Sequence, residues 1–384
     1  MTQDTAPHST KTPRPSRRTV LRAAAALGGI ASIGPWYVKN ALSSSGEITL
    51  LNWADQLPDP VLPNFTAKTG IKVNTTPFSR IDEVLNKLQA TDGEGFDLVQ
   101  NALPRAPQFR EQGLLQPWNT EKLNIDNLEA PLIQSSIDRW SWDGGLYHIP
   151  HVWGTEGLAW RTDAVDLTPQ DASWGLLWDE RYRGRVTGRT QSLITIIGLW
   201  LDANGSVPSN RLLDTYTDET KAREVFDRVL AFAIENKPAI KQFWTSSDSI
   251  KSSFVENGAV IGGTWDGPIR TLALAGTPVG FGLPKEGALT WIDGWSLPKA
   301  SRNVEQAYEL VNYVISPEVS AIISEKSGNN PVAKGASALL STDARGLYET
   351  IYGNIDPVRL WSWPAQPAWH AKLISQYAER YRAA

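Results

Sequence analysis

Two short segments in the last third of the chain place a tryptophan near an aspartate. The first has Trp265 and Asp266 side by side, and the second has Trp291 followed two residues later by Asp293. An aromatic face attracts a cation, and a carboxylate pairs with the N–H groups of one. Tryptophan is also a good core residue and the chain has 17 of them, so a tryptophan alone does not indicate a site. The inference of a binding site therefore depends on the neighbouring carboxylates. These segments, expected as turn-rich loops, predict a site for a small organic cation.

The elements that must position such a site begin with alternating strands and helices. Buried strands are expected at Glu47–Trp53, Ile71–Thr75 and Phe96–Val99. A loop and short helix are expected over Asp55–Thr69, and an amphipathic helix over Ile81–Gln89. This alternation is typical of a parallel, doubly wound sheet.

In sheets of this kind, ligands bind beyond the carboxyl ends of the strands. This rule places Trp53 and a turn at Gln100–Ala102 at the mouth of the site. Tyr147–Trp160 is extended and apolar, as expected of a strand that crosses between two parts of the fold. Further elements are expected at Ala222–Ile234, Ala259–Gly263, Ile269–Ala275, Val279–Leu283, Gln306–Ile315, Pro317–Ser324 and Ala371–Arg382.

Residues 1–41 are expected to be a targeting segment. Ser16–Arg22 matches the twin-arginine export pattern, and Ala23–Ile33 is a short apolar run after it. That run is too short for a confident membrane span, and Ala41 is the best candidate for a cleavage site, so an uncleaved anchor stays open. The twin-arginine translocase is therefore an expected partner during export.

Composition excludes several function classes. The chain has no Cys, hence no disulfide, thiolate metal site or Cys nucleophile. Of its 37 basic and 41 acidic residues, six basic and one acidic precede residue 42, which leaves a net charge of −9 and argues against a nucleic-acid partner. His148 and His151 fall on opposite faces of the crossing strand, so neither a metal site nor a cofactor is expected.

The order of motifs from residue 47 onward resembles the periplasmic solute-binding proteins of ABC importers, and most of all their spermidine/putrescine-binding branch. The motifs are Leu51–Trp53, Phe65–Val73, Asp97–Val99, Ile149–Gly154, Ser173–Gly184, Pro284–Gly287, Trp291–Asp293 and Asn312–Val319. The resemblance implies an α/β fold of the two-lobed type II kind, with a mostly parallel sheet flanked by helices in each lobe and the ligand in a cleft between them. Residues 46–152 with 288–337 would form lobe 1, and residues 153–287 with 342–384 lobe 2.

The resemblance also implies ligand contacts. Trp53, Trp265 and Trp291 would stack on an aliphatic chain, and Asp293 would hold an amine. Further candidates are Gln56 and Asn329, which stand where the family has aromatic residues, the extra acid Asp266, and either Trp361 or Trp363 in the tail, with Trp361 preferred.

The chain departs from the family at the far end of the site. Ala102 and Pro104 replace a Ser and a Tyr, and Thr190–Ser192, following Arg189, stands near the place of a missing pair of acids. The expected function is a monomeric periplasmic receptor that captures a polyamine-like cation and delivers it to an ABC permease in the inner membrane. Another small amine, a zwitterion or an anion stays open as ligand. An enzyme on the same scaffold, using Asp293, Asp266 or Glu156, is the less favoured alternative.

Overall fold

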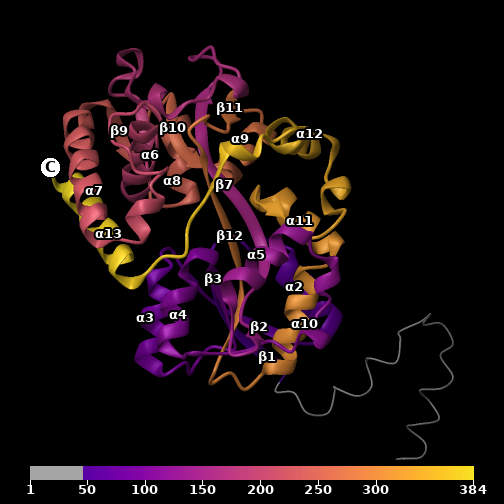
Figure 1. The fold of residues 1–384 in the computed structure, drawn as a ribbon. Helices are drawn as coiled ribbons and strands as arrows, with labels where there is room; N and C mark the ends of the chain where they lie inside the picture. Colours follow the sequence, from indigo (N-terminus) through magenta and orange to yellow (C-terminus); the bar gives the residue numbers. More distant parts are fainter. Residues whose placement is uncertain (1–45) are drawn as a thin grey trace, which may run out of the picture. The chain divides into compact units, whose positions relative to one another are not determined.

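Two long antiparallel strands run side by side through the middle of the protein, whose computed structural model describes residues 46–384 (Figure 1). They are β7 (Ile149–Arg161) and β12 (Ala288–Pro298). Most of their residues are buried, as expected of strands covered on both faces. The first half of β7 pairs with β12, and its second half pairs with strands of the other part of the fold. The expected crossing strand is therefore present, with β12 as a second one beside it.

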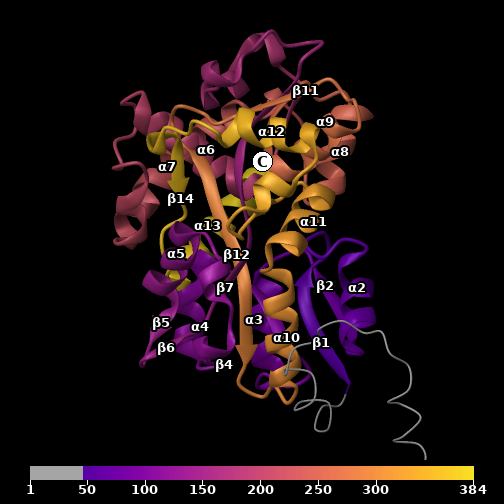
Figure 2. The same ribbon diagram turned by 90° about the vertical axis from the view of Figure 1, so that its right-hand side faces the viewer.

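A set of parallel strands flanks this central pair on each side. The order across the sheet is β2-β1-β3-β12-β7-β10-β8-β9, in which β1 is parallel to β2 and β3, and β8 is parallel to β9 and β10. The outer strands are β1 (Glu47–Trp53), β2 (Lys72–Phe78), β3 (Leu98–Ala102), β8 (Val186–Gly188), β9 (Ile240–Phe243) and β10 (Ile261–Trp265). Each set belongs to one of the two α/β lobes expected from the sequence, visible one above the other in Figures 1 and 2.

Helices cover the sheet in both lobes. In the lobe of β1 these are α2 (Val61–Thr69), α3 (Asp82–Thr91), α4 (Ala106–Gln112), α5 (Ala130–Trp140), α10 (Val304–Val314) and α11 (Pro317–Ser327). Around β8 lie α6 (Thr190–Ala203), α7 (Glu219–Glu235), α8 (Ser247–Val255), α9 (Asp266–Leu274), α12 (Thr342–Tyr352) and α13 (Ala368–Ala383). Short strands complete the fold: β4 (Leu115–Gln116), β5 (Ser141–Trp142), β6 (Gly145–Leu146), β11 (Val279–Gly282), β13 (Asn330–Pro331) and β14 (Leu360–Ser362).

Each lobe has its own apolar core. Phe65 and Trp295 lie in the core beneath β1, and Trp174 and Phe226 in the core between β8 and helices α6 and α7. The C-terminal helix α13 packs on α6 and α7, so the tail ends on the second lobe (Figure 1). The exact lobe boundaries stay a prediction.

The structure corrects three local expectations. Thr264–Gly267 is not a turn, because Thr264 and Trp265 end β10 while Asp266 and Gly267 begin α9. The other two corrections concern β12 and β3. Thr290–Gly294 lies inside β12 and is not a turn, and Gln100–Ala102 extends β3. In both cases pairing with a strand distant in sequence overrides the local turn preference of residues such as Gly294. The export segment lies outside the described residues. From residue 46 onward, no helix is long and apolar enough to cross a membrane.

Candidate ligand-binding site

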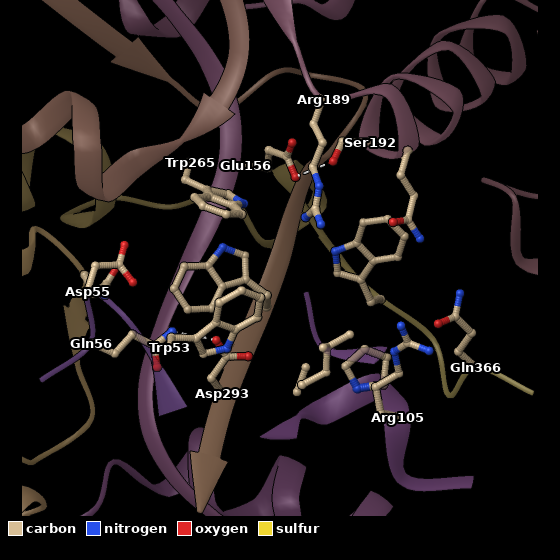
Figure 3. Close-up of a pocket in the computed structure, with 17 residues that line it drawn as sticks. Trp53, Asp55, Gln56, Arg105, Glu156, Arg189, Ser192, Trp265, Asp293 and Gln366 are labelled. Atoms are coloured by element: carbon tan, nitrogen blue, oxygen red, sulfur yellow. Dashed lines mark hydrogen bonds between the residues drawn. The ribbon is translucent and has the colours of Figure 1, made fainter. Parts of the chain in front are cut away.

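A cavity of about 150 Å³ lies between the two lobes, beside the crossing strands (Figure 3). Topology explains its position. The carboxyl ends of the parallel strands β1 and β3 in one lobe, and of β8 and β10 in the other, all reach its wall. Six of the eight residues predicted from the sequence line it: Trp53, Gln56, Trp265, Trp291, Asp293 and Asn329.

Three tryptophan rings form one wall of the cavity, and other residues hold each in place. Trp53, at the end of β1, packs against Phe78 with ring centroids 4.5 Å apart. Trp265, at the end of β10, packs edge to face against Trp244, with ring centroids 4.7 Å apart. Trp291 lies so close to Gly154 of β7 that a Cβ there would be 2.4 Å from its ring. Rings held this firmly present fixed faces to a ligand, which lowers the entropic cost of binding.

Asp293 is the carboxylate of this wall. It is 6% exposed, and its Oδ2 accepts a hydrogen bond of 2.7 Å from Gln56 Nε2. Gln56 is oriented in turn by Gln100, whose Nε2 donates to Gln56 Oε1 at 3.0 Å. Burial raises the pKa of Asp293 to about 7; the Gln56 hydrogen bond lowers the pKa, and the nearby charge of Asp55 raises it. A cation bound beside Asp293 would favour the ionised form and complete its hydrogen bonding.

Asp266 lies outside the cavity lining. It is fully buried at the start of α9, and its oxygens accept hydrogen bonds from Thr155 N (3.3 Å), Asn330 Nδ2 (2.8 Å) and Tyr352 Oη (2.5 Å). These donors come from β7, β13 and α12. Burial raises its pKa, and the Tyr352 hydrogen bond is the largest opposing effect. Asp266 therefore joins elements of the fold in this structure and does not face a ligand.

The two tail tryptophans also differ in place. Trp361, on β14, is buried against Tyr216, and its indole N–H donates to Arg211 O at 2.8 Å. Trp363 lies beyond the end of the strand and lines the cavity. Of the two rings considered from the sequence, the cavity wall holds Trp363, because the pairing of β14 with β12 directs Trp361 into the core of the second lobe.

The rest of the cavity lining consists, apart from Trp363, of residues that the sequence analysis did not select as ligand contacts. They are Asp55, Ile81, Ala102, Pro104, Arg105, Glu156, Arg189, Gln191, Ser192 and Gln366. The sequence could have indicated three of these residues as ligand contacts. Arg189, Gln191 and Ser192 directly follow β8, and the rule that ligands bind beyond strand carboxyl ends applies to both lobes.

Glu156, considered only as a catalytic group, comes from β7 and is 3% exposed. Its Oε2 accepts a hydrogen bond of 2.9 Å from Ser192 Oγ, and its Oε1 is buried with no hydrogen-bond partner in the described chain. Burial raises its pKa to about 7, against the effects of the Ser192 hydrogen bond and the charge of Arg189. The cavity therefore has a second acidic group that is only partly ionised near neutral pH.

His148, just before β7, and His151, on β7, both have structural partners. His148 Nε2 donates to Asn101 O at 3.3 Å, and its Nδ1 then accepts from Ser136 Oγ at 2.8 Å. His151 Nε2 donates to Gln56 O at 3.1 Å. Burial lowers their pKa values to about 3 and about 4. Within residues 46–384, no cluster of three His, Cys, Asp or Glu could hold a metal ion.

Known proteins share this sequence pattern and fold. The family described as bacterial extracellular solute-binding protein matches residues 62–345. The spermidine/putrescine-binding periplasmic protein of Escherichia coli is 25% identical over 336 residues, which cover 86% of this chain and 90% of that protein. The putrescine-binding periplasmic protein PotF of Escherichia coli is 28% identical over 317 residues, covering 78% and 82%.

A solved structure agrees with these relatives in its fold. The spermidine/putrescine ABC transporter substrate-binding protein PotD of Streptococcus pneumoniae superposes with a TM-score of 0.69 at 20% identity, covering 88% of this chain and 98% of that one. The resemblance inferred from the order of motifs is thereby confirmed, as is the two-lobed fold. Because the family match spans most of the chain, including both crossing strands, the protein belongs to the bacterial extracellular solute-binding proteins.

Proposed function

We propose that this protein is the extracytoplasmic receptor of an ABC importer, that it captures a small organic amine of the polyamine-like class, and that it delivers this ligand to the permease. The single observation that carries the proposal is the buried carboxylate of Asp293, held by Gln56 among Trp53, Trp265 and Trp291. The names of the relatives, which refer to spermidine and putrescine, support the same ligand class.

The strength of this arrangement suits a receptor. Micromolar binding needs about 8 kcal/mol. A hydrogen bond to the charged Asp293 contributes about 1.5–3 kcal/mol, and each cation–π contact with a tryptophan about 0.5–2 kcal/mol. One carboxylate and three rings therefore account for most of the affinity for one ammonium group.

Binding without chemical conversion fits the neighbours of Asp293. Its one hydrogen-bond donor among the described residues is the Gln56 amide, which stabilises a carboxylate but does not relay protons. A general base would need a positioned proton donor or nucleophile within reach. We therefore propose a receptor and not an enzyme, with no cofactor.

Native mass spectrometry of the protein purified from its own periplasm tests the proposal. An amine of low mass should be retained, and calorimetry with that amine should show one site per chain. Retention of a ligand without any amine group would contradict the proposed function.

Cleft closure is the second test. Both lobes line the cavity, so a bound ligand should favour a closed form over a more open free form. Small-angle scattering should then show a smaller radius of gyration at saturating ligand. An unchanged profile, with binding demonstrated in the same sample, would indicate a rigid site. We place the lobe boundaries at residues 46–152 with 288–337 and 153–287 with 342–384.

We further propose that the protein acts as a periplasmic monomer exported by the twin-arginine translocase, with an uncleaved N-terminal anchor still open. The arginine pair supports this route. The double change Arg17→Lys and Arg18→Lys should leave precursor in the cytoplasm, detected by fractionation. Normal periplasmic accumulation of the double variant would contradict twin-arginine export.

A further inference from the structure

Two arginines, Arg105 and Arg189, line the side of the cavity across from Gln56, and their surroundings differ (Figure 3). Arg105 is compensated, because it forms a 2.5 Å salt bridge with Asp82 and donates to Gln108 Oε1 at 2.9 Å. The guanidinium of Arg189 forms no hydrogen bond and no salt bridge with any residue between 46 and 384. This cavity-lining guanidinium therefore has N–H donors that are free to bind a ligand.

Arg189 is held in this position by aromatic rings. Its guanidinium lies 5.7 Å from the ring centre of Trp265 and 6.0 Å from that of Trp244. The reason is topological: Arg189 follows β8 and Trp265 ends the neighbouring parallel strand β10, so both emerge at the same sheet edge. Burial lowers the pKa of Arg189, while the charge of Glu156 raises it. A desolvated but charged guanidinium needs an anionic partner, and buried charges in proteins are normally paired.

The N-terminus of α6 adds to the positive character of this wall. Arg189 is its N-cap residue, no side chain caps the helix, and its first turn contains no acidic residue. Gln191 and Ser192 of that turn line the cavity. Free backbone N–H groups and the helix dipole favour an anion at such an end. The guanidinium and the helix end therefore converge on one place.

Glu156 does not neutralise this wall. It forms no salt bridge with Arg189, and its Oε2 is engaged by Ser192. Its pKa of about 7 leaves it only partly charged near neutral pH. A ligand with a second ammonium group would place that group near the uncompensated charge of Arg189, where like charges repel.

We propose, on the basis of the function proposed above, that the ligand is a short zwitterion whose ammonium group binds Asp293 and whose carboxylate binds Arg189 and the N-terminus of α6. An ω-amino carboxylate has this chemistry. A cavity of about 150 Å³ suits a short chain. Arg189 is then a specificity-determining residue, which selects an amino carboxylate against a diamine of equal length.

Four probes of equal carbon number test this inference: 4-aminobutanoate, 1,4-diaminobutane, butylamine and butanoate. They differ only in the charged groups at the two ends. Calorimetry with the wild-type protein should show at least tenfold tighter binding of 4-aminobutanoate than of 1,4-diaminobutane, with butylamine and butanoate both weaker than 4-aminobutanoate. Tighter binding of the diamine, or no binding by any ω-amino carboxylate of three to six carbons, would overturn the inference.

Variants locate the effect. Arg189→Gln should weaken 4-aminobutanoate at least tenfold and improve 1,4-diaminobutane, and Arg189→Lys should retain part of the preference. Arg185→Gln is the matched control, because Arg185 is exposed and precedes β8 in the same segment. Unchanged selectivity in Arg189→Gln would overturn the role of Arg189.

The two proposals fail in different ways. If Asp293→Asn abolishes amine binding and Arg189→Gln changes no selectivity, the amine receptor stands and the zwitterion inference falls. If Asp293→Asn leaves the affinity for every amine unchanged, the amine-binding function itself falls. The wild-type probe series decides the ligand class even if an arginine variant does not fold.

Discussion

Asp266 and Asp293 come from two Trp–Asp segments of similar sequence, yet the fold gives them opposite roles. Asp266 receives three hydrogen bonds, from Thr155, Asn330 and Tyr352, and is fully buried. Asp293 receives one, from Gln56, and faces the cavity. A carboxylate can accept about four hydrogen bonds. An adjacent tryptophan therefore does not distinguish the two acids, whereas acceptor capacity left unused toward a cavity does, and on this ground we propose Asp293 and not Asp266 as the ligand-binding acid.

The largest expected effect is on ligand affinity in Asp293→Asn. This change keeps the shape of the side chain and removes its charge, so a bound amine should lose about 2–5 kcal/mol, as for one partner of a buried charge pair. Calorimetry with the retained ligand measures the loss. Folding stability should not fall, because burying the charge of Asp293 is unfavourable in the empty protein. Wild-type affinity in this variant would contradict the proposed cation site.

Trp291→Ala should cost about 2 kcal/mol or more of binding free energy, as loss of a buried aromatic anchor does. Its effect should not add to that of Asp293→Asn, because both residues line one cavity. Trp361→Phe is the matched control: it removes an indole N–H that donates to Arg211 O outside the cavity and should leave the affinity unchanged. If Trp361→Phe weakens binding as much as Trp291→Ala, position in the cavity wall does not decide which tryptophans bind the ligand.

Asp266→Asn should act on stability and spare affinity. In either orientation the new NH2 group would face existing donors: Asn330 and Tyr352, which both donate to Oδ2 of Asp266, or Thr155 N, which donates to Oδ1. Leaving a buried donor unsatisfied costs about 1–3 kcal/mol of unfolding free energy. Urea unfolding of the empty protein measures this loss. A large fall in affinity, with stability unchanged, would show that Asp266 belongs to the site after all.

The last expected effect is the pH dependence of folding stability and of amine affinity. The folded-state pKa of Asp293, about 7, lies above its ordinary value of 3.8. Its contribution to the stability of the empty protein is thus complete below about pH 4 and lost as pH rises to 7, by at most about 1.4 kcal/mol per pH unit. Amine affinity should change in the opposite direction, weakening as pH falls below 7.

Thermal unfolding and calorimetry between pH 5 and 8 check both trends. In Asp293→Asn the pH dependence of stability that is due to Asp293 should vanish. The contribution of Glu156, whose pKa is also about 7, should remain. If Asp293→Asn keeps the full wild-type pH dependence of amine affinity, a group other than Asp293 controls that dependence.

Local pattern alone determined much of the fold. The strand Glu47–Trp53 was predicted with its observed bounds, and the helix closed by Gly70 was predicted because a left-handed C-terminal residue favours glycine. The position of Trp53 at the end of its strand followed from the same pattern. These features depend on side-chain periodicity and on residues near in sequence, so no tertiary information was needed.

Only the tertiary structure decided which polar groups face one another. The sequence does not reveal that Thr155, Asn330 and Tyr352 converge on Asp266, because these groups come from distant elements. Nor does it reveal that Arg189 reaches the cavity with no hydrogen-bond or salt-bridge partner among residues 46–384. The expected turn at Thr290–Gly294 became a central strand for the same reason: β3 and β7 supply its hydrogen bonds. Composition and spacing determined the kinds of residues available for a site, and long-range strand pairing determined which of them line the cavity.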